Sequence, residues 1–447
     1  MATVLRTDLR PRPAGLSWFN IVRLGTVQAA IGAIVMLATS LLNRVMVVEY
    51  AVAAAVPAAL VAWHYAVQLS RPLWGHKSDR SARRSPWIVG GLGILALGAI
   101  LAVDATIMMA DAGAGAVLLA LASFTMIGLG VGMSGTALLA LLASRVSVER
   151  KPAAAAISWT MMVAGIVIAA GLSGAFLDPF SEPRLAIVVS LVALIAFCLA
   201  MLALHGVEDN NPVVHRPQSD QQSADFVAVL KDIWQDREAR RFTYFVFISM
   251  LAYSMQDLIM EPFAGFLFAM TPGQSTQLSS LQHGGILAGM LVAGAGGSLH
   301  ARRFGQNLKL WIVTGCLGSA VMLAGLSLAA SSGPSWPLRA NVFGLGIANG
   351  VFAVAAVSAM LGLASKGTAS GEGARMGVWG GSQAIAFGLG GLSGAIIVDQ
   401  LRALTGQDAA AFQIVFGVEA LLFIVAALVA TGTSMTSRKS SREAAET

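Results

Sequence analysis

Hydrophobic residues in this chain are gathered into long stretches, separated from one another by short polar segments. An α-helix needs about 20 apolar residues to cross a hydrocarbon core of roughly 30 Å. Twelve stretches have this length: about 24–42, 51–69, 87–109, 116–143, 153–176, 185–205, 242–270, 278–299, 308–330, 338–364, 376–398 and 411–430. The pattern predicts an all-α membrane protein of twelve transmembrane helices.

One long polar segment divides these stretches into six and six. We therefore expect an N-terminal six-helix half over 1–206, a cytoplasmic linker over 207–241, and a C-terminal six-helix half with a short tail over 242–447. The linker ends in the charged run KDIWQDREARR, which favours an amphipathic surface helix.

The two halves repeat one another in sequence. Trp159 precedes the motif GLSGA at 171–175 by twelve positions, and Trp379 precedes a second GLSGA at 391–395 by the same twelve. An aspartate follows each motif shortly afterwards. Such a repeat is typical of transporter folds built from two pseudo-symmetric halves around a central cleft.

Composition and charge agree with a membrane protein. Hydrophobic residues make up 56% of the chain and charged residues only 12%, which is too apolar for a soluble domain of this size. Of the 29 Lys and Arg, all but Arg44, Arg184, Arg339 and Arg402 fall on one side of the predicted membrane. The positive-inside rule then predicts both termini in the cytoplasm of a multi-pass inner-membrane protein. The net charge of +6 thus reflects topology, and no nucleic-acid partner is expected.

Four ionisable residues lie within or near the ends of apolar stretches: Arg44 and Glu49 late in the first, and Asp257 and Glu261 in the seventh. Intramembrane charges are costly and usually face an interior cavity. Asp257 and Glu261 are four positions apart and share a helix face, so both could meet Arg44 between the halves. The sequence leaves open whether this group is a structural latch or a substrate or proton site.

Two histidines also lie in predicted helices, His64 in WHY and His283 in QHGG. An imidazole with small neighbours is a candidate axial ligand for the magnesium of a chlorin, although most such histidines are hydrogen-bonded core residues. No metal site of the protein's own and no catalytic constellation such as HExxH or a nucleophile elbow is found, so no enzymatic activity is predicted.

The loop between the second and third stretches reads GHKSDRSARR. It resembles the GxxxDRxGRR loop of the major facilitator superfamily through Gly75, Asp79, Arg80, Arg83 and Arg84, with Ala82 in place of the second glycine. We expect Gly75 to allow close helix packing, Asp79 to pair with Arg83 or a helix end, and the arginines to anchor at the membrane surface. An ordinary positive-inside loop is the alternative.

Longer blocks point to one branch of that superfamily. The segments NRVMVVE (43–49), AVQLSRPLWGHKSD (66–79), QDLIMEPFAGFLFAMTPGQSTQLSSLQHGG (256–285) and RMGVWGGSQAIAFGLGG (375–391) resemble the PucC/LhaA-type bacteriochlorophyll delivery family. The resemblance spans nearly the whole chain.

This resemblance implies a light-harvesting biogenesis factor that binds or delivers bacteriochlorophyll or a precursor as cargo, or that supports the enzymes of late pigment synthesis. Its implied partners are the bilayer, the pigment, and either chlorophyll synthase and geranylgeranyl reductase or light-harvesting apoproteins. Arg44, Glu49, His64, Asp257, Glu261 and His283 are the candidate pigment-binding or substrate-binding residues. The alternative is a proton-coupled secondary transporter of a small solute, in which Asp257 or Glu261 cycles protons.

Overall fold

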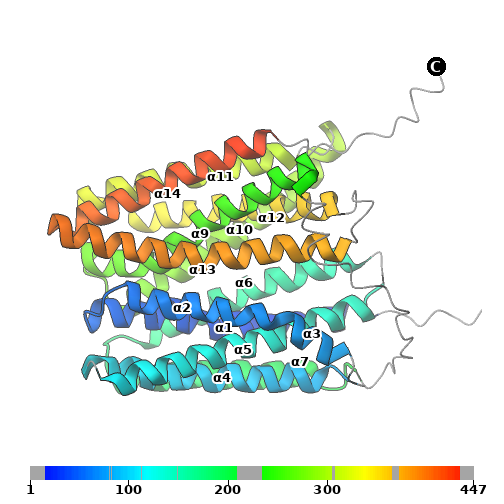
Figure 1. The fold of residues 1–447 in the computed structure, drawn as a ribbon, viewed down its shortest axis with the longest axis horizontal. Coiled ribbons are helices and arrows are strands. Elements are labelled where there is room, and N and C mark those ends of the chain that lie inside the picture. The colour runs from blue at the N-terminus through cyan, green and yellow to red at the C-terminus, as the bar shows by residue number, and fades with distance from the viewer. Residues whose placement is uncertain are drawn as a thin grey trace, which may run out of the picture.

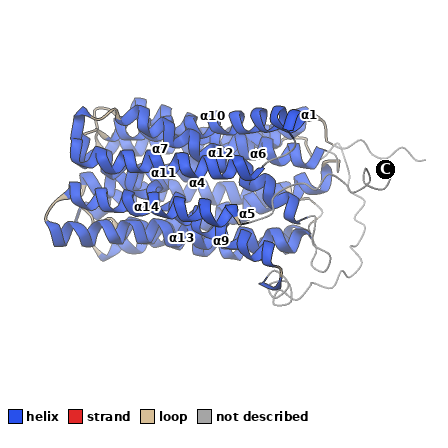
Figure 2. Cartoon of the chain, turned by 90° about the horizontal axis from the view of Figure 1, so that it is seen from above, coloured by secondary structure: helices blue, strands red, loops and turns tan. Residues whose placement is uncertain are grey.

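The structure is a computed structural model that describes residues 16–79, 81, 83–111, 113–147, 150–208, 234–304, 308–364 and 372–432. Within these residues the chain folds into long helices that run side by side (Figure 1), with no strand (Figure 2). The first half comprises α1 (Trp18–Met36) with η1 (Leu37–Leu42) and η2 (Val45–Glu49), α2 (Ala55–Val67) with η3 (Gln68–Ser70) and α3 (Arg71–Asp79), α4 (Ser85–Met108) with η4 (Met109–Asp111), α5 (Ala114–Arg145), α6 (Lys151–Phe176) and α7 (Glu182–Leu204). The second half comprises α9 (Arg237–Phe268), α10 (Pro272–Phe304), α11 (Leu308–Ser332) with η6 (Gly333–Ser335), α12 (Leu338–Ala364), α13 (Glu372–Thr405) and α14 (Asp408–Thr431).

Ten of the described helices are long and apolar enough to cross a membrane. Two further helical segments run alongside them in Figure 1: Ala55–Asp79, in which α2 and α3 are joined by the 3₁₀ turn η3, and α10. The first ends in charged residues, and α10 begins with the polar run PGQSTQLSSLQH. These two segments complete the predicted twelve-helix fold.

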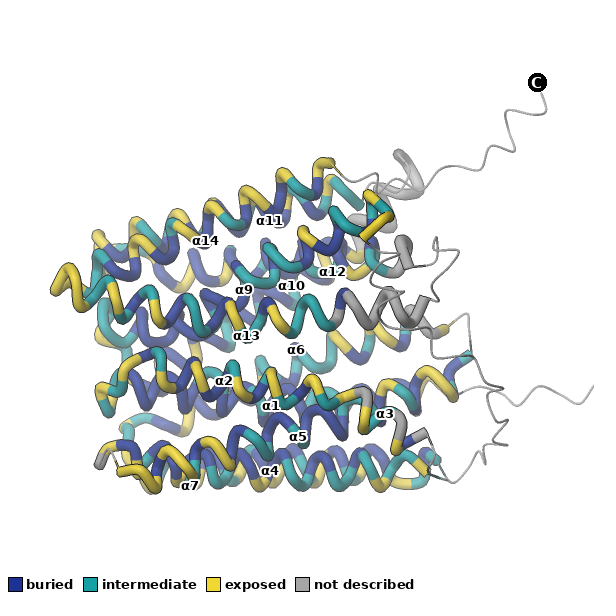
Figure 3. Tube along the Cα trace, viewed as in Figure 1, coloured by how far each residue is buried: buried dark blue, intermediate teal, exposed yellow. Residues whose placement is uncertain are grey.

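Each half has its own buried apolar core. One core is drawn almost entirely from residues 16–207 and the other from residues 239–430. Figure 3 shows buried residues toward the inside of the bundle and exposed residues along its outer faces. Many Leu, Val and Ile side chains are exposed on the helices, so the outer surface is suited to lipid. The predicted linker helix lies mostly outside the described residues, and α9 begins at Arg237, inside the predicted linker.

The halves meet mainly through α2 against α13 and α6 against α10. Small residues allow the close approach of α6 and α10: a Cβ on Gly174 would lie 2.6 Å from the carbonyl oxygen of Gly273. The end of the first membrane segment, Leu37–Glu49, is wound as a π-helix and packs against α9. π-helical turns are often found at functional sites.

The bundle has two ends, which we call the terminal end and the distal end. The terminal end carries the start of α1 and the end of α14; there the N–H of Leu16 donates to the carbonyl of Arg145 and Arg241 donates to the carbonyl of Gly432. The distal end is the opposite one, where α2 and α10 begin. The four Lys/Arg exceptions all lie in the distal part, because Arg184 and Arg339 start their helices there and Arg44 and Arg402 lie near the ends of theirs.

Candidate functional site

A cluster of aromatic and titratable side chains lies between the two halves, and we call it the central site. It consists of Tyr65 from α2, Tyr253 and Asp257 from α9, His283 from α10 and Phe387 from α13. The Phe387 ring joins the two tyrosines, with centroid distances of 5.6 Å to Tyr65 and 5.7 Å to Tyr253. Asp257 lies near His283 and both tyrosines.

An apolar patch that also spans the halves adjoins this site. Val163 of α6 packs with Ile286 and Met290 of α10, and Tyr253 packs against the same patch. Four of the five residues of the central site are only partly buried, and His283 is 8% exposed. The arrangement therefore offers flat aromatic and aliphatic surfaces beside one carboxylate and one imidazole.

His283 is held in a defined tautomer. Its Nδ1 lies 2.9 Å from the carbonyl oxygen of Ser279, one helical turn earlier, and a carbonyl can only accept. The proton of the neutral ring is therefore on Nδ1, and the lone pair is on Nε2. An Nδ1–H bonded to a backbone carbonyl is the usual arrangement of a metal-ligating histidine.

The ring nitrogens of His64 are hydrogen-bonded differently from those of His283. Its Nε2 lies 2.7 Å from the amide nitrogen of Gln68, whose oxygen accepts from Arg71. The Gln68 amide thus donates to the Nε2 lone pair, and Nδ1 is buried without a partner. Of the two histidines named as candidate magnesium ligands, the geometry fits His283 and argues against His64.

Three of the four charged residues named from the sequence, Arg44, Glu49 and Glu261, belong to one polar network at the distal end. Arg44, 1% exposed, forms an ion pair with Glu49 of its own segment. Its Nε donates to the hydroxyl of Ser275 at 3.1 Å, and its Nη2 donates to the carbonyl of Met270 at 2.7 Å. The cross-half contacts of Arg44 are thus made to α10 and the loop before it.

Glu261 belongs to the same network through hydroxyl groups. It accepts from Ser40, from Thr276 at 3.3 Å and from Ser275 at 3.4 Å, so Ser275 lies between Arg44 and Glu261. Asp257, one helical turn away, faces the central site instead. Of the two acids that could meet Arg44, the structure brings Glu261 into the network of Arg44 through Ser275, whereas Asp257 lies at the central site.

The cytoplasmic loop motif is partly described. Arg84 donates to the carbonyl of Ala140 and to the hydroxyl of Ser144 at 2.7 Å, near the end of α5, and Arg83 is exposed. Gly75 faces α5, but a Cβ there would lie 3.4 Å from Thr136, an ordinary contact, so close packing does not require this glycine. Arg80 and the side chain of Asp79 lie outside the described residues, so the expected Asp79 pairing stays a prediction.

Glu208, just after α7, contacts the start of α4 next to this loop. Its carboxylate accepts from the backbone N–H groups of Arg84 at 2.8 Å and Ser85 at 2.9 Å, and from the Ser85 hydroxyl at 2.6 Å. Burial opposes ionisation, but these hydrogen bonds at the start of α4 outweigh it, so the pKa of Glu208 lies below its ordinary value.

Sequence reasoning missed several polar residues of the interior. Neither Tyr65 nor Tyr253 was named as a candidate from the sequence, and only the tertiary fold brings them to Phe387. Glu419 in α14 is fully buried, and both its oxygens lack a hydrogen-bond partner among the described residues. A signal for Glu419 did exist, because it is the only charged residue in the predicted stretch 411–430.

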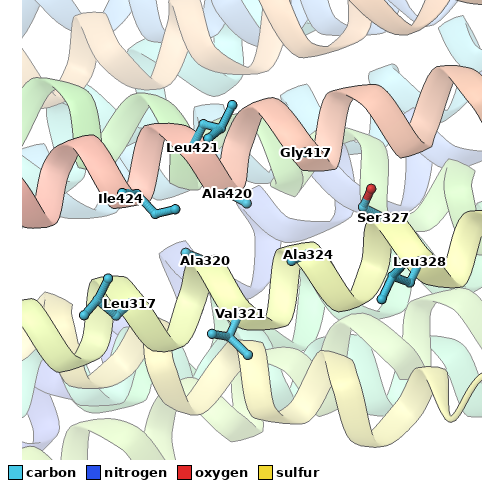
Figure 4. Close-up of a pocket in the computed structure, with 10 residues that line it drawn as sticks. All are labelled: Leu317, Ala320, Val321, Ala324, Ser327, Leu328, Gly417, Ala420, Leu421 and Ile424. Atoms are coloured by element: carbon cyan, nitrogen blue, oxygen red, sulfur yellow. The ribbon is translucent and has the colours of Figure 1, made fainter.

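An apolar groove of about 690 Å³ lies on the outer face between α11 and α14 (Figure 4). Small residues, among them Ala320, Ala324, Gly417 and Ala420, alternate with larger ones such as Leu421. The hydroxyl of Ser327 is satisfied by the carbonyl of Gln413 at 2.8 Å. The groove thus offers hydrocarbon contact without a polar anchor.

Known structures share the fold. A POT family transporter in complex with a thioalcohol-conjugated peptide superposes with a TM-score of 0.68 at 12% identity, covering 93% of this chain and 96% of its own. The nucleoside transporter NupG gives a TM-score of 0.63 at 16% identity, covering 92% and 98%. Both are transporters of the major facilitator type, which establishes the fold class expected from the repeat.

Sequence comparison identifies the family. The chain is 48% identical over 417 residues to the protein named bacteriochlorophyll synthase 44.5 kDa chain of Rhodobacter capsulatus, covering 93% of this chain and 96% of that protein. It is 30% identical to Protein PucC of the same organism, covering 91% and 90%. The family described as PUCC protein matches residues 41–437. The chain therefore belongs to the PucC protein family, as its sequence blocks indicated.

Proposed function

We propose that this protein is a membrane-embedded pigment biogenesis factor that binds a magnesium tetrapyrrole of the bacteriochlorophyll type at the central site. Membership of the PucC family and the name of the 48% identical relative support this assignment. We further propose that the protein lies in the bacterial inner membrane with its terminal end in the cytoplasm, because that end carries most of its Lys and Arg.

The observation that carries the proposal is the hydrogen bond from Nδ1 of His283 to the carbonyl of Ser279. In the neutral ring this bond leaves Nε2 as the nitrogen that would bind the magnesium of a tetrapyrrole. The rings of Tyr65, Tyr253 and Phe387 supply flat apolar surfaces of the kind that stack on a macrocycle. Carbonyl groups on the rim of such a pigment can accept from the tyrosine hydroxyls.

The proposed role is that of an accessory factor rather than an enzyme. In this role the protein holds or presents pigment, and the covalent chemistry belongs to its partners. The proposed partners are pigment-synthesis enzymes such as chlorophyll synthase and geranylgeranyl reductase, with light-harvesting apoproteins as the alternative. The words bacteriochlorophyll synthase in the relative's name support the first class.

Purified protein in detergent, titrated with bacteriochlorophyll, tests the proposal. We expect a shifted pigment absorption band and induced visible circular dichroism. His283→Ala should lower the affinity for the pigment at least about tenfold. His64→Ala is the matched control, because Nε2 of His64 already accepts from Gln68, and it should leave the affinity within about twofold. Equal effects of the two substitutions, or no induced signal in the unsubstituted protein, would overturn the assignment.

A second candidate is a proton-coupled transporter. Its supporting observation is the carboxylate of Asp257 in the interior of a transporter fold. Such a carrier would drive solute uptake into proteoliposomes under a proton gradient, and Asp257→Asn would abolish that uptake. The pigment-binding proposal expects no gradient-dependent uptake in either protein.

A further inference from the structure

Several polar contacts between the described parts of the two halves lie at the distal end. Besides the Arg44 network, Ser280 donates to the carbonyl of Val167 at 2.9 Å and Asn43 donates to the carbonyl of Leu258 at 2.7 Å. In Figure 1, α9 and α14 rise away from α4 and α7 toward the terminal end. In two further distal contacts, an aspartate of one half accepts hydrogen bonds from the start of a helix of the other half.

The first of these contacts joins Asp399 to the start of α2. Its carboxylate oxygens accept from the backbone N–H groups of Ala54 at 3.2 Å and Ala55 at 2.8 Å. The first N–H groups of a helix have no partner inside the helix, and an N-cap side chain usually satisfies them. Alanine at the N-cap of α2 cannot do so. The cap of α2 is therefore supplied by α13, from the opposite half.

The second contact joins Asp178 to the start of α10. Its Oδ2 accepts from the hydroxyl of Thr271 at 2.7 Å, and its Oδ1 accepts from the N–H of Gly273 at 3.3 Å. A Cβ on Gly273 would lie 2.5 Å from the same carboxylate, so this approach requires glycine. Asp178 follows α6, and here too the carboxylate reaches a helix of the other half.

The two contacts occupy corresponding places in the two halves, and α10 is in addition capped by Thr271, whose hydroxyl accepts from the N–H of Gln274 at 3.2 Å. Asp178 and Asp399 follow the two GLSGA motifs by three and four positions, and α2 and α10 each form the second membrane segment of a half. Each carboxylate lies at the positive end of a helix dipole. A hydrogen bond from a backbone N–H to an ionised carboxylate is stronger than one between neutral groups.

We infer that Asp178 and Asp399 are paired latches that hold the distal end closed, so that breaking both caps opens the space between the halves toward that end. Rotation of one half against the other would withdraw both carboxylates together, and water would then solvate the freed N–H groups. The fold is thereby bistable, with a closed state favoured by the two caps. The inference does not depend on which ligand the central site takes.

Distances between spin labels in nanodiscs test this inference. A variant with Cys198→Ala and Cys316→Ala would carry labels at exposed distal positions of the two halves, Ala114→Cys and Leu404→Cys. A second pair, Leu139→Cys and Val357→Cys, would report on the terminal end. We expect one short distal distance when both aspartates are present.

Replacing the latches should shift the populations. Each of Asp178→Ala and Asp399→Ala should raise the ratio of distal-open to distal-closed protein about tenfold, and the double variant about a hundredfold, with the terminal pair moving closer. Asp408→Ala is the matched control. It removes an aspartate at the same end whose partner, Arg402 at 2.6 Å, belongs to the same half, and it should leave both distances unchanged.

Two results would overturn the inference. One is an unchanged distal distribution in the double variant; the other is opening by Asp408→Ala to the same extent. If the double alanine variant does not fold, Asp178→Asn and Asp399→Asn retain an acceptor oxygen without its charge and should give a smaller shift in the same direction. A disulfide formed in Ala54→Cys/Asp399→Cys should suppress any open population, and its failure to do so would also contradict the inference.

Discussion

The amide nitrogen of Gln68 lies 2.7 Å from Nε2 of His64, one helical turn away. This contact occupies the lone pair that a magnesium ligand would need. Gln68→Leu should leave a buried ring nitrogen without its partner and lower the stability of the protein by about 1–3 kcal/mol, with pigment affinity unchanged. Thermal unfolding in detergent measures the first effect, and the exposed Gln277→Leu is the control. A loss of pigment affinity in Gln68→Leu would contradict this role for His64.

Arg44 is the most deeply buried charged member of the distal network. Arg44→Met leaves Glu49, Ser275 and the Met270 carbonyl without their donor, and the loss of such hydrogen bonds to a buried charged group should cost about 1.5–3 kcal/mol. Arg44→Lys should recover little of this loss because one ammonium cannot replace the three-way contact of a guanidinium. Thermal unfolding of these variants measures both effects.

The control for Arg44 is the more exposed ion pair at the same end of the bundle. Arg402→Met removes the partner of Asp408, and the two side chains are 29% and 36% exposed. We expect a change of about 1 kcal/mol or less. If Arg402→Met lowered the stability as much as Arg44→Met, the burial of Arg44 would not explain how strongly its contacts stabilise the protein.

Close packing of α10 against α12 depends on Gly289. A Cβ there would overlap the carbonyl oxygen of Ile347, so Gly289→Ala should force the two helices apart and cost about 1–3 kcal/mol. Gly284 lies on the same helix, and a Cβ there would meet no neighbouring atom of the described residues within 4 Å. Gly284→Ala should therefore be neutral or stabilise the protein by up to about 1 kcal/mol. Midpoints of thermal unfolding for the two variants test this difference.

Glu208 should make stability depend on pH. Because the pKa of its carboxyl is lowered in the folded protein, its contribution is fully present above the ordinary value of 4.5 and is lost as the pH falls through the lowered value. Glu208→Gln should lower stability at pH 7 by about 1 kcal/mol, as expected for a weakened helix cap, and by less in acid. An equal loss at pH 7 and pH 4, measured by thermal unfolding, would argue against this cap.

Much of the fold could be predicted because it depends on the apolar length of individual segments of the chain. Lipid requires long apolar helices whose backbone groups bond internally, so hydropathy alone indicates the spans. Ala55–Asp79 and α10 carry polar side chains and lie at the interface between the halves, where these side chains find partners in protein instead of lipid. The corresponding stretches 51–69 and 278–299 were predicted from their apolar length, and the even number of helices agreed with the uneven distribution of positive charge.

The candidate site was less predictable because its contacts join residues far apart in sequence. The i, i+4 spacing of Asp257 and Glu261 correctly implied a shared helix, but it could not show that Ser275 and Thr276 would separate Glu261 from Arg44. His64 and His283 look alike in sequence. Only hydrogen bonds from Gln68 and to Ser279 distinguish their ring nitrogens.

By itself, the sequence determined a twelve-helix protein of two related halves, its family, and the side on which its positive charges gather, because apolar length, repetition and charge are read along the chain. Only the tertiary structure decided which titratable groups meet. It brought Tyr65 and Tyr253 onto Phe387 and placed Asp178 and Asp399 on helices of the opposite half. The physical reason is that hydrogen bonds and ring contacts act over a few ångströms, and helix packing sets which side chains come within that range.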